Sequence, residues 1–95
     1  DCSGLTQWTY GKAGINLPRT EQQQYDVTRH IPLLEAKAGD LVFFHSTYNA
    51  GSYITHIGIY LGDNRMFHAG DPIGYADLTS SYWQQHLVGA GRIKQ

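Results

Sequence analysis

The first part of the chain has the spacing of an amphipathic helix. Apolar residues recur every three to four positions between Ser3 and Ala13, which predicts a helix of about three turns. Asp1 and Ser3 are residue types that cap the start of a helix, and Gly14 suits the left-handed conformation that often ends one. We therefore expect the chain to open with a capped helix that packs one apolar stripe against the rest of the domain.

The rest of the chain has the pattern of one more short helix followed by strands. A capping-box sequence begins at Thr20 and predicts a second helix that runs to about Val27. Short alternating runs of β-branched and aromatic residues then predict strands at 41–45, 54–61, 65–69 and 88–93, with a helical turn at 82–86. Helices followed by antiparallel strands indicate an α+β domain, and we expect the helices on one face of the sheet.

The hairpin formed by the second and third predicted strands carries two histidines. A three-residue loop at 62–64, ending in an asparagine that tolerates a left-handed backbone, places His56 and His68 on one face as diagonal neighbours. A two- or four-residue turn would put them on opposite faces. Gly58 lies in mid-strand on the same face as His56, and a glycine there indicates that something packs closely against it. We expect that partner to be the helix that carries Cys2.

Cys2 is the candidate nucleophile because it stands at the start of the first predicted helix. The unpaired amides and partial positive charge of a helix N-terminus favour the thiolate, which is the reactive form of cysteine. Gly4 leaves room for a substrate or another backbone to approach. The alternative for Cys2 is a small buried apolar residue without chemistry, which is the usual role of an isolated cysteine.

A nucleophilic cysteine needs a base, and the histidines differ as candidates. We expect His30 and His86 on the surface and His45 at the rim of a site. His56 is the best candidate for the base, with His68 orienting its ring. The alternative for His56 is a half-buried histidine that only satisfies its hydrogen bonds.

Composition limits the remaining possibilities. The chain has 95 residues, enough for a single domain over 1–95, with 7 basic against 8 acidic residues and no basic cluster, which argues against nucleic-acid binding. The longest apolar run, at 41–44, is far too short to span a membrane. His45, His56 and His68 could join Cys2 at a metal, but zinc sites usually show a closely spaced ligand pair and none occurs here. We expect no metal and no other cofactor.

Five short motifs follow one another along the chain. They are Asp1-Cys2-Ser3-Gly4-Leu5, Leu17-Pro18-Arg19-Thr20, Gly39-Asp40-Leu41-Val42-Phe43-Phe44, His56-Ile57-Gly58-Ile59-Tyr60-Leu61-Gly62 and Met66-Phe67-His68-Ala69. In this order they resemble the motifs of the NlpC family of papain-like bacterial cell-wall peptidases. Tyr82-Trp83 and Gly91-Arg92-Ile93 fit as well, so the resemblance covers essentially the whole chain.

The resemblance implies a cysteine endopeptidase with a papain-like α+β core, in which a helix carrying the cysteine packs on an antiparallel sheet. Such enzymes cut the stem peptides of peptidoglycan, commonly between D-glutamate and the following diamino acid. Cys2 would match the nucleophile, His56 the base and His68 the third polar member of the site. Asp1 and Ser3 would match positions that shape the substrate groove. Attack by the sulfur would give a thioester that water then hydrolyses.

The resemblance also carries expectations about context. The family usually has a segment before its cysteine, with a tyrosine and a glycine-rich stretch; here the chain opens at Asp1, so we expect a fragment or a processed form without that segment. We expect a secreted domain that works at the bacterial cell wall, as a monomer within a larger multidomain hydrolase such as an autolysin. Two alternatives stay open: a thiol amidase that cuts the sugar–peptide junction, and a catalytically silent wall-binding domain.

Overall fold

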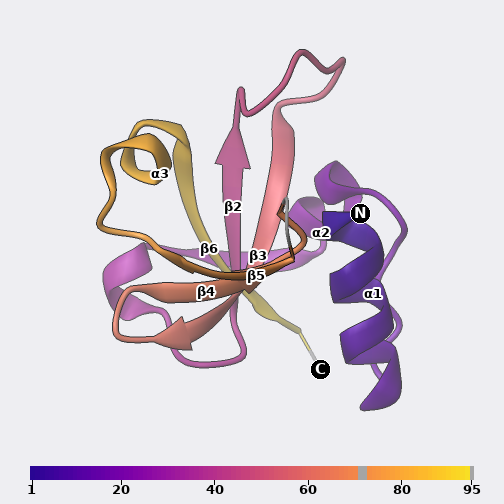
Figure 1. Ribbon diagram of the computed structural model, residues 1–95. Helices are drawn as coiled ribbons and strands as arrows, with labels where there is room; N and C mark the ends of the chain where they lie inside the picture. Colours follow the sequence, from indigo (N-terminus) through magenta and orange to yellow (C-terminus); the bar gives the residue numbers. More distant parts are fainter. Residues whose placement is uncertain (71–72, 95) are drawn as a thin grey trace.

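The computed structural model of the chain describes residues 1–70 and 73–94, in which two helices precede the strands. Six strands within these residues form one antiparallel sheet (Figure 1). In chain order the elements are α1 (Cys2–Lys12), α2 (Glu21–Asp26), β1 (Thr28–Ile31), the 3-10 helix η1 (Leu33–Glu35), β2 (Leu41–His45), β3 (Ile54–Gly62), β4 (Arg65–His68), β5 (Gly74–Asp77), α3 (Ser81–His86) and β6 (Leu87–Ile93). The predicted α+β class is therefore confirmed.

The strand order in the sheet is β1-β6-β2-β3-β4-β5, so the last strand of the chain lies between β1 and β2. The four predicted strands and the helical turn before the last of them are present, with ends that differ by one residue at most. Strands β1 and β5 were not predicted, because each has four residues and exposed side chains. Gly91 of β6 has room for no side chain, since a Cβ there would meet Phe43 at 2.7 Å.

Both faces of the sheet are covered. On one, which we call the α1 face, Phe43 and Ile57 pack in one core cluster with Cys2 of α1. On the other, the α3 face, Phe44 and Met66 form a second cluster that Trp83 of α3 packs against. Figure 1 shows α1 and α2 on one side and α3 on the other. The expectation that all helices lie on one face was wrong, because β2 is buried on both sides and needs a cover on each.

The helix ends follow the sequence pattern. The Asp1 carboxylate caps α1 by accepting from the Gly4 amide at 2.7 Å, and after α1 the backbone turns left-handed at Gly14, with φ 82°. Ser3, also predicted as a cap residue, lies inside the helix instead. At α2, Thr20 and Gln23 form the predicted reciprocal capping box. None of the helices among residues 1–70 and 73–94 has the length and apolar character needed to cross a membrane.

The β3–β4 hairpin has the predicted register, but its turn differs from the predicted three-residue loop. Tyr60 lies opposite Met66, as a three-residue loop requires. The turn itself contains two left-handed residues, Asp63 with φ 52° and Asn64 with φ 59°, and the extra residue is taken up by a bulge between Tyr60 and Gly62. A two-residue turn plus a one-residue bulge has the same parity as a three-residue loop, so His56 and His68 face the same side.

Candidate active site

His56 of β3 and His68 of β4 form a hydrogen-bonded pair. His56 Nε2 lies 2.9 Å from His68 Nδ1, and the two rings meet edge to face with centroids 5.0 Å apart. The contact between these rings was predicted from the hairpin register and is present. Because Nε2 of His56 is engaged by His68, Nδ1 is the nitrogen left to act on another group.

Trp83 of α3 holds both imidazoles from the side. Its ring stacks on His56 with a centroid distance of 5.3 Å and an angle of 25°, and it meets His68 edge-on at 5.2 Å. Phe44 packs against the same indole at 4.8 Å. From the sequence alone, Trp83 was assigned no role beyond fitting a family motif. Its neighbour Tyr82 and its place in a short predicted helix were the only local signs that it could matter.

Burial controls the protonation of the histidine pair. The surroundings of His56 lower its pKa to about 4, first through burial and then through the charge that His68 would add. Burial also lowers the pKa of His68, which is 8% exposed. Both rings are therefore neutral at pH 7.

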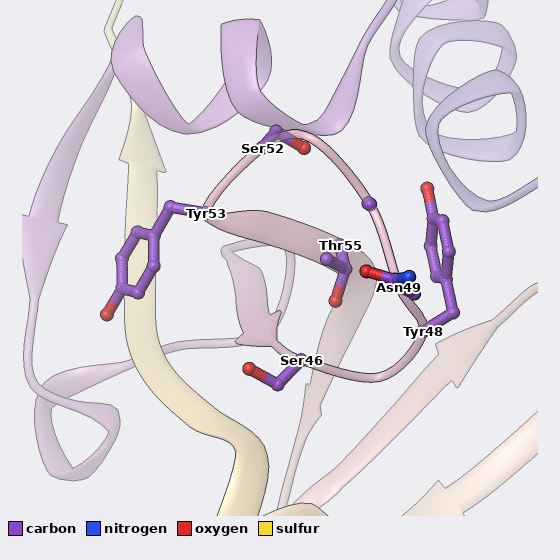
Figure 2. A pocket seen from close by; sticks show the side chains of 7 residues that line it. Ser46, Tyr48, Asn49, Ser52, Tyr53 and Thr55 are labelled. Carbon is purple, nitrogen blue, oxygen red and sulfur yellow. The ribbon is translucent and has the colours of Figure 1, made fainter.

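The pair opens into a cavity of about 650 Å³ that Trp83 and Tyr48 also line. A neighbouring cavity of about 420 Å³ lies inside the loop at 46–53 between β2 and β3, and Figure 2 shows the hydroxyl and amide side chains around it. Tyr48 lines both cavities, and in Figure 2 it stands at the edge of the loop nearest α1. The two cavities therefore share Tyr48 as a lining residue.

Cys2 begins α1 and is nearly buried, with 7% of its surface exposed. Its thiol donates to Glu21 Oε1 at 3.1 Å. Burial, followed by this hydrogen bond and the Glu21 charge, raises the pKa of Cys2 to about 12, although the backbone amides of Ile57 and Ser3 act in the opposite direction. The expectation that the helix start makes Cys2 a thiolate was wrong for this state, because burial and a carboxylate outweigh the amides.

The predicted route by which Cys2 approaches His56 was also wrong. The space over Gly58 is filled by the Met66 side chain, not by α1. Helix α1 packs on the opposite face of the sheet, where the Cys2 sulfur lies beside the backbone amide of Ile57. The structure thus places the thiol one residue along β3 from His56, and Cys2 is not among the residues that line the histidine cavity.

Asp1 and Ser3, the predicted groove residues, are both held by Arg19. The guanidinium donates to the Ser3 hydroxyl at 2.8 Å and pairs with the Asp1 carboxylate at 3.0 Å. Asp1 is exposed, whereas Ser3 is 2% exposed. Arg19 belongs to the second family motif, and sequence reasoning gave it no part in the site. The structure brings these three residues together beside Cys2.

The other histidines hold local structure. His30 is exposed, as predicted, and its ring stacks on Tyr25. His86 was expected on the surface but is half-buried, and its Nδ1 lies 2.9 Å from the carbonyl oxygen of His45. His45 itself is half-buried and hydrogen-bonds to Ser46. Across the part of the chain that the structure describes, no group of three or more His, Cys, Asp or Glu side chains is arranged to hold a metal ion.

The fold and these side chains define an α+β domain with a buried thiol at a helix start and a paired imidazole on its sheet. The chain belongs to the NlpC/P60 family, which it matches over residues 1–92. The family resemblance seen in the sequence is therefore confirmed.

Three similar proteins illustrate the range of this family. The chain is 59% identical over 95 residues to the bifunctional muramidase/DL-endopeptidase CwlT of Bacillus subtilis, covering 99% of this chain and 29% of that protein. A crystal structure of a lipoprotein-like NLP/P60 family protein from Staphylococcus aureus is 66% identical, with a TM-score of 0.98, and this chain covers 32% of it. RipD from Mycobacterium tuberculosis is 26% identical, with a TM-score of 0.79 over 100% of this chain and 67% of that one; it is described as a non-catalytic NlpC/p60 domain protein adapted to peptidoglycan binding. The chain thus spans less than a third of the first two relatives.

Proposed function

We propose that the chain is the catalytic domain of a peptidoglycan hydrolase: a cysteine endopeptidase that cuts stem peptides at the D-glutamyl–diamino acid bond. Its membership of the NlpC/P60 family and its 59% identity to a protein named as a DL-endopeptidase support this proposal. The RipD likeness shows that membership of the family does not by itself make a domain catalytic. The proposal therefore depends on the side chains of this chain.

The observation that carries the proposal is the hydrogen-bonded pair of His56 and His68. A base for cysteine chemistry must be neutral at working pH and held in one orientation. Burial keeps His56 neutral, and His68 and Trp83 fix its ring. A wall-binding domain has no need of a neutral, oriented imidazole next to the strand residue that contacts its only cysteine.

In the proposed reaction the Cys2 thiol leaves Glu21 and its place beside the Ile57 amide and turns toward His56. His56 Nδ1 takes the thiol proton, and the sulfur attacks the carbonyl carbon of the scissile amide. The C–N bond breaks as His56 returns that proton to the departing amine, which leaves a thioester on Cys2. A water molecule then attacks the thioester carbonyl, giving its proton to His56, and the C–S bond breaks to release a carboxylate and the thiol. The Cys2 backbone amide at the start of α1 is suited to stabilise the oxyanion in both steps.

Asp1 and Ser3 have a supporting part in this proposal. They flank the nucleophile, and Arg19 fixes both side chains, so we assign them to the wall of the substrate groove beside Cys2. The short share of its relatives that the chain covers fits a single catalytic domain, acting as a monomer within a longer hydrolase. Because the substrate lies in the cell wall, we place the whole protein outside the cytoplasm, at the wall.

Digestion of purified peptidoglycan, followed by mass spectrometry of the products, tests the proposal. The expected products are fragments with a new N-terminal diamino acid. Free stem peptides released from intact glycan would instead support the amidase alternative and contradict the endopeptidase. The Cys2→Ala variant should keep the fold, judged by circular dichroism, and release nothing. Turnover by Cys2→Ala above background would remove Cys2 from its assigned role.

The high pKa of the Cys2 thiol gives a second candidate function some support. A protonated, nearly buried sulfur is inert, and the RipD relative is named as a peptidoglycan-binding domain without catalysis. On that reading the protein would bind peptidoglycan sacculi in a pelleting assay and yield no soluble fragments. Release of fragments by the wild type, abolished in Cys2→Ala, would exclude it.

A further inference from the structure

We propose that Glu21 is a positioning residue that holds the Cys2 thiol in its protonated form while no substrate is bound. This inference rests on the proposed function, in which Cys2 is the nucleophile. The contact that supports it is the hydrogen bond from the thiol to Glu21 Oε1, 3.1 Å long and nineteen positions apart in the sequence. A carboxylate that accepts from S–H stabilises the thiol and opposes the thiolate, which its negative charge repels.

Packing between the two helices puts Glu21 at this place. Gln24 is fully buried, and its side-chain amide donates to the carbonyl oxygens of Ser3 at 3.0 Å and Pro18 at 2.9 Å. Residues three apart share a helix face, so anchoring Gln24 on α1 also turns Glu21 toward the start of α1. The capping box at Thr20 fixes the first turn of α2, in which Glu21 is the first residue. The position of the Glu21 carboxylate is therefore set by two independent constraints, the anchored Gln24 side chain and the capping box.

Burial is the first cause that opposes ionisation of Cys2, and among the charged groups around this contact Glu21 is the one that adds to it. Asp1 and Arg19 face it from the N-terminal side, but they pair with each other. From the loop between β2 and β3 comes Tyr48, a phenol whose pKa is raised by burial, Glu21 and Cys2, and which is neutral at pH 7.

The sheet and the helix start act on the sulfur in the other direction. From β3 comes the amide of Ile57, beside the neutral His56, and from α1 the amide of Ser3. Both amides favour the thiolate, so removal of the Glu21 charge should let them act.

Such a hold has a use in a domain with a single cysteine that, by the proposed function, works at the cell wall. Thiolates react with peroxides: R–S⁻ attacks one oxygen of hydrogen peroxide, the O–O bond breaks, and sulfenic acid and hydroxide result. A thiol kept as S–H and nearly buried reacts far more slowly. Substrate that displaces Glu21 would release the sulfur only when it is needed. Glu21 thus separates a resting, oxidation-resistant state from the reactive one.

The rate of alkylation by iodoacetamide measures this hold directly, because the chain contains one cysteine and intact mass reports its modification. The variants are Glu21→Gln, which keeps the size and removes the charge, and Glu35→Gln, a matched control at an exposed glutamate of η1. We expect Glu21→Gln to react about tenfold faster at pH 7.5, since one unit of pKa changes the thiolate fraction tenfold. Its rate should also begin to rise at a lower pH. Oxidation by hydrogen peroxide should accelerate in parallel.

Equal rates for the wild type and Glu21→Gln across pH 6–10 would overturn the proposal, as would a slower variant or an equal acceleration in Glu35→Gln. Both variants should alkylate at the wild-type rate in urea, which shows that the difference belongs to the folded state. If Glu21→Gln fails to fold, Glu21→Ser, which leaves space for water at the same helix position, replaces it. Peptidoglycan takes no part in these assays. Failure of the hold therefore leaves the proposed function intact, and an inactive wild type would refute that function without altering the alkylation rates.

Discussion

The lowered pKa of His56 predicts a specific loss of folding stability in mild acid. In the unfolded chain the imidazole titrates near 6.5, and in the folded protein near 4. Between these pH values the imidazole is protonated in the unfolded chain but neutral in the folded protein, so the free energy of unfolding falls as the pH falls. The part of the free energy of unfolding that comes from keeping His56 neutral is complete above pH 6.5. It decreases as the pH falls below 6.5 and changes no further below pH 4.

The size of the effect follows from the shift. A difference of about 2.5 pKa units, at 1.36 kcal/mol for each unit, corresponds to roughly 3 kcal/mol lost between pH 7.5 and pH 4. That is a large part of the stability of a small domain. Other groups also titrate in this range, among them His68, so the wild type alone does not isolate His56.

A comparison with His56→Gln isolates the contribution. Glutamine can hydrogen-bond to His68 but does not titrate, so its unfolding free energy should fall less steeply with pH. Urea unfolding followed by tryptophan fluorescence, at pH 7.5 to 4.0, should show the difference between the two proteins shrinking by roughly 3 kcal/mol. His30→Gln, at an exposed histidine, should follow the wild type. Parallel curves for wild type and His56→Gln would refute the idea that burial of His56 sets its pKa.

Three further predictions concern the same framework. His56→Ala should lower kcat/KM on stem peptides by about a thousandfold or more. His68→Ala should lower it by about ten- to a hundredfold, since His68 only orients the base. Equal losses in steady-state assays would show that His68 itself carries a proton or is needed for folding. Trp83→Ala should cost about 2 kcal/mol in urea unfolding and move the His56 pKa toward its ordinary value, seen by NMR titration; an unchanged pKa would mean that the indole does not shield the ring. Asp40→Asn should lower the free energy of unfolding by about 2 kcal/mol at pH 7, because Asp40 pairs with Arg92 at 2.8 Å. Burial acts to raise the Asp40 pKa, but Arg92 and the Lys37 amide lower it on balance. The stability advantage of the wild type should therefore disappear in strong acid, and an advantage that persists there would contradict this assignment.

The features that the sequence predicted well are those set by near neighbours. The Asp1 cap and the Thr20 capping box depend on residues three positions away, so both can be predicted from the local sequence. The meeting of His56 and His68 depends only on the parity of one hairpin. The turn differed in detail from the prediction, but the bulge preserved the parity, and parity decides which face a side chain takes.

The features that the sequence did not predict depend on packing between distant segments. Helix α1 was expected over Gly58, but Met66 comes from the adjacent strand and fills that space first. The protonation of Cys2 was predicted from its own helix, whereas Glu21 from α2 and burial decide it. Trp83 reaches the histidines from the far end of the chain. No local pattern encodes such contacts, since each requires the relative placement of two elements.

The position of β6 between β1 and β2 has a consequence for biosynthesis. Residues 87–93 are synthesised after β1 and β2, yet they supply hydrogen-bond partners to both of these strands. Until they emerge, β2 has an unpaired edge and apolar side chains on both faces, which makes the nascent chain prone to wrong pairing. The sheet is therefore expected to be completed only after β6 has left the ribosome.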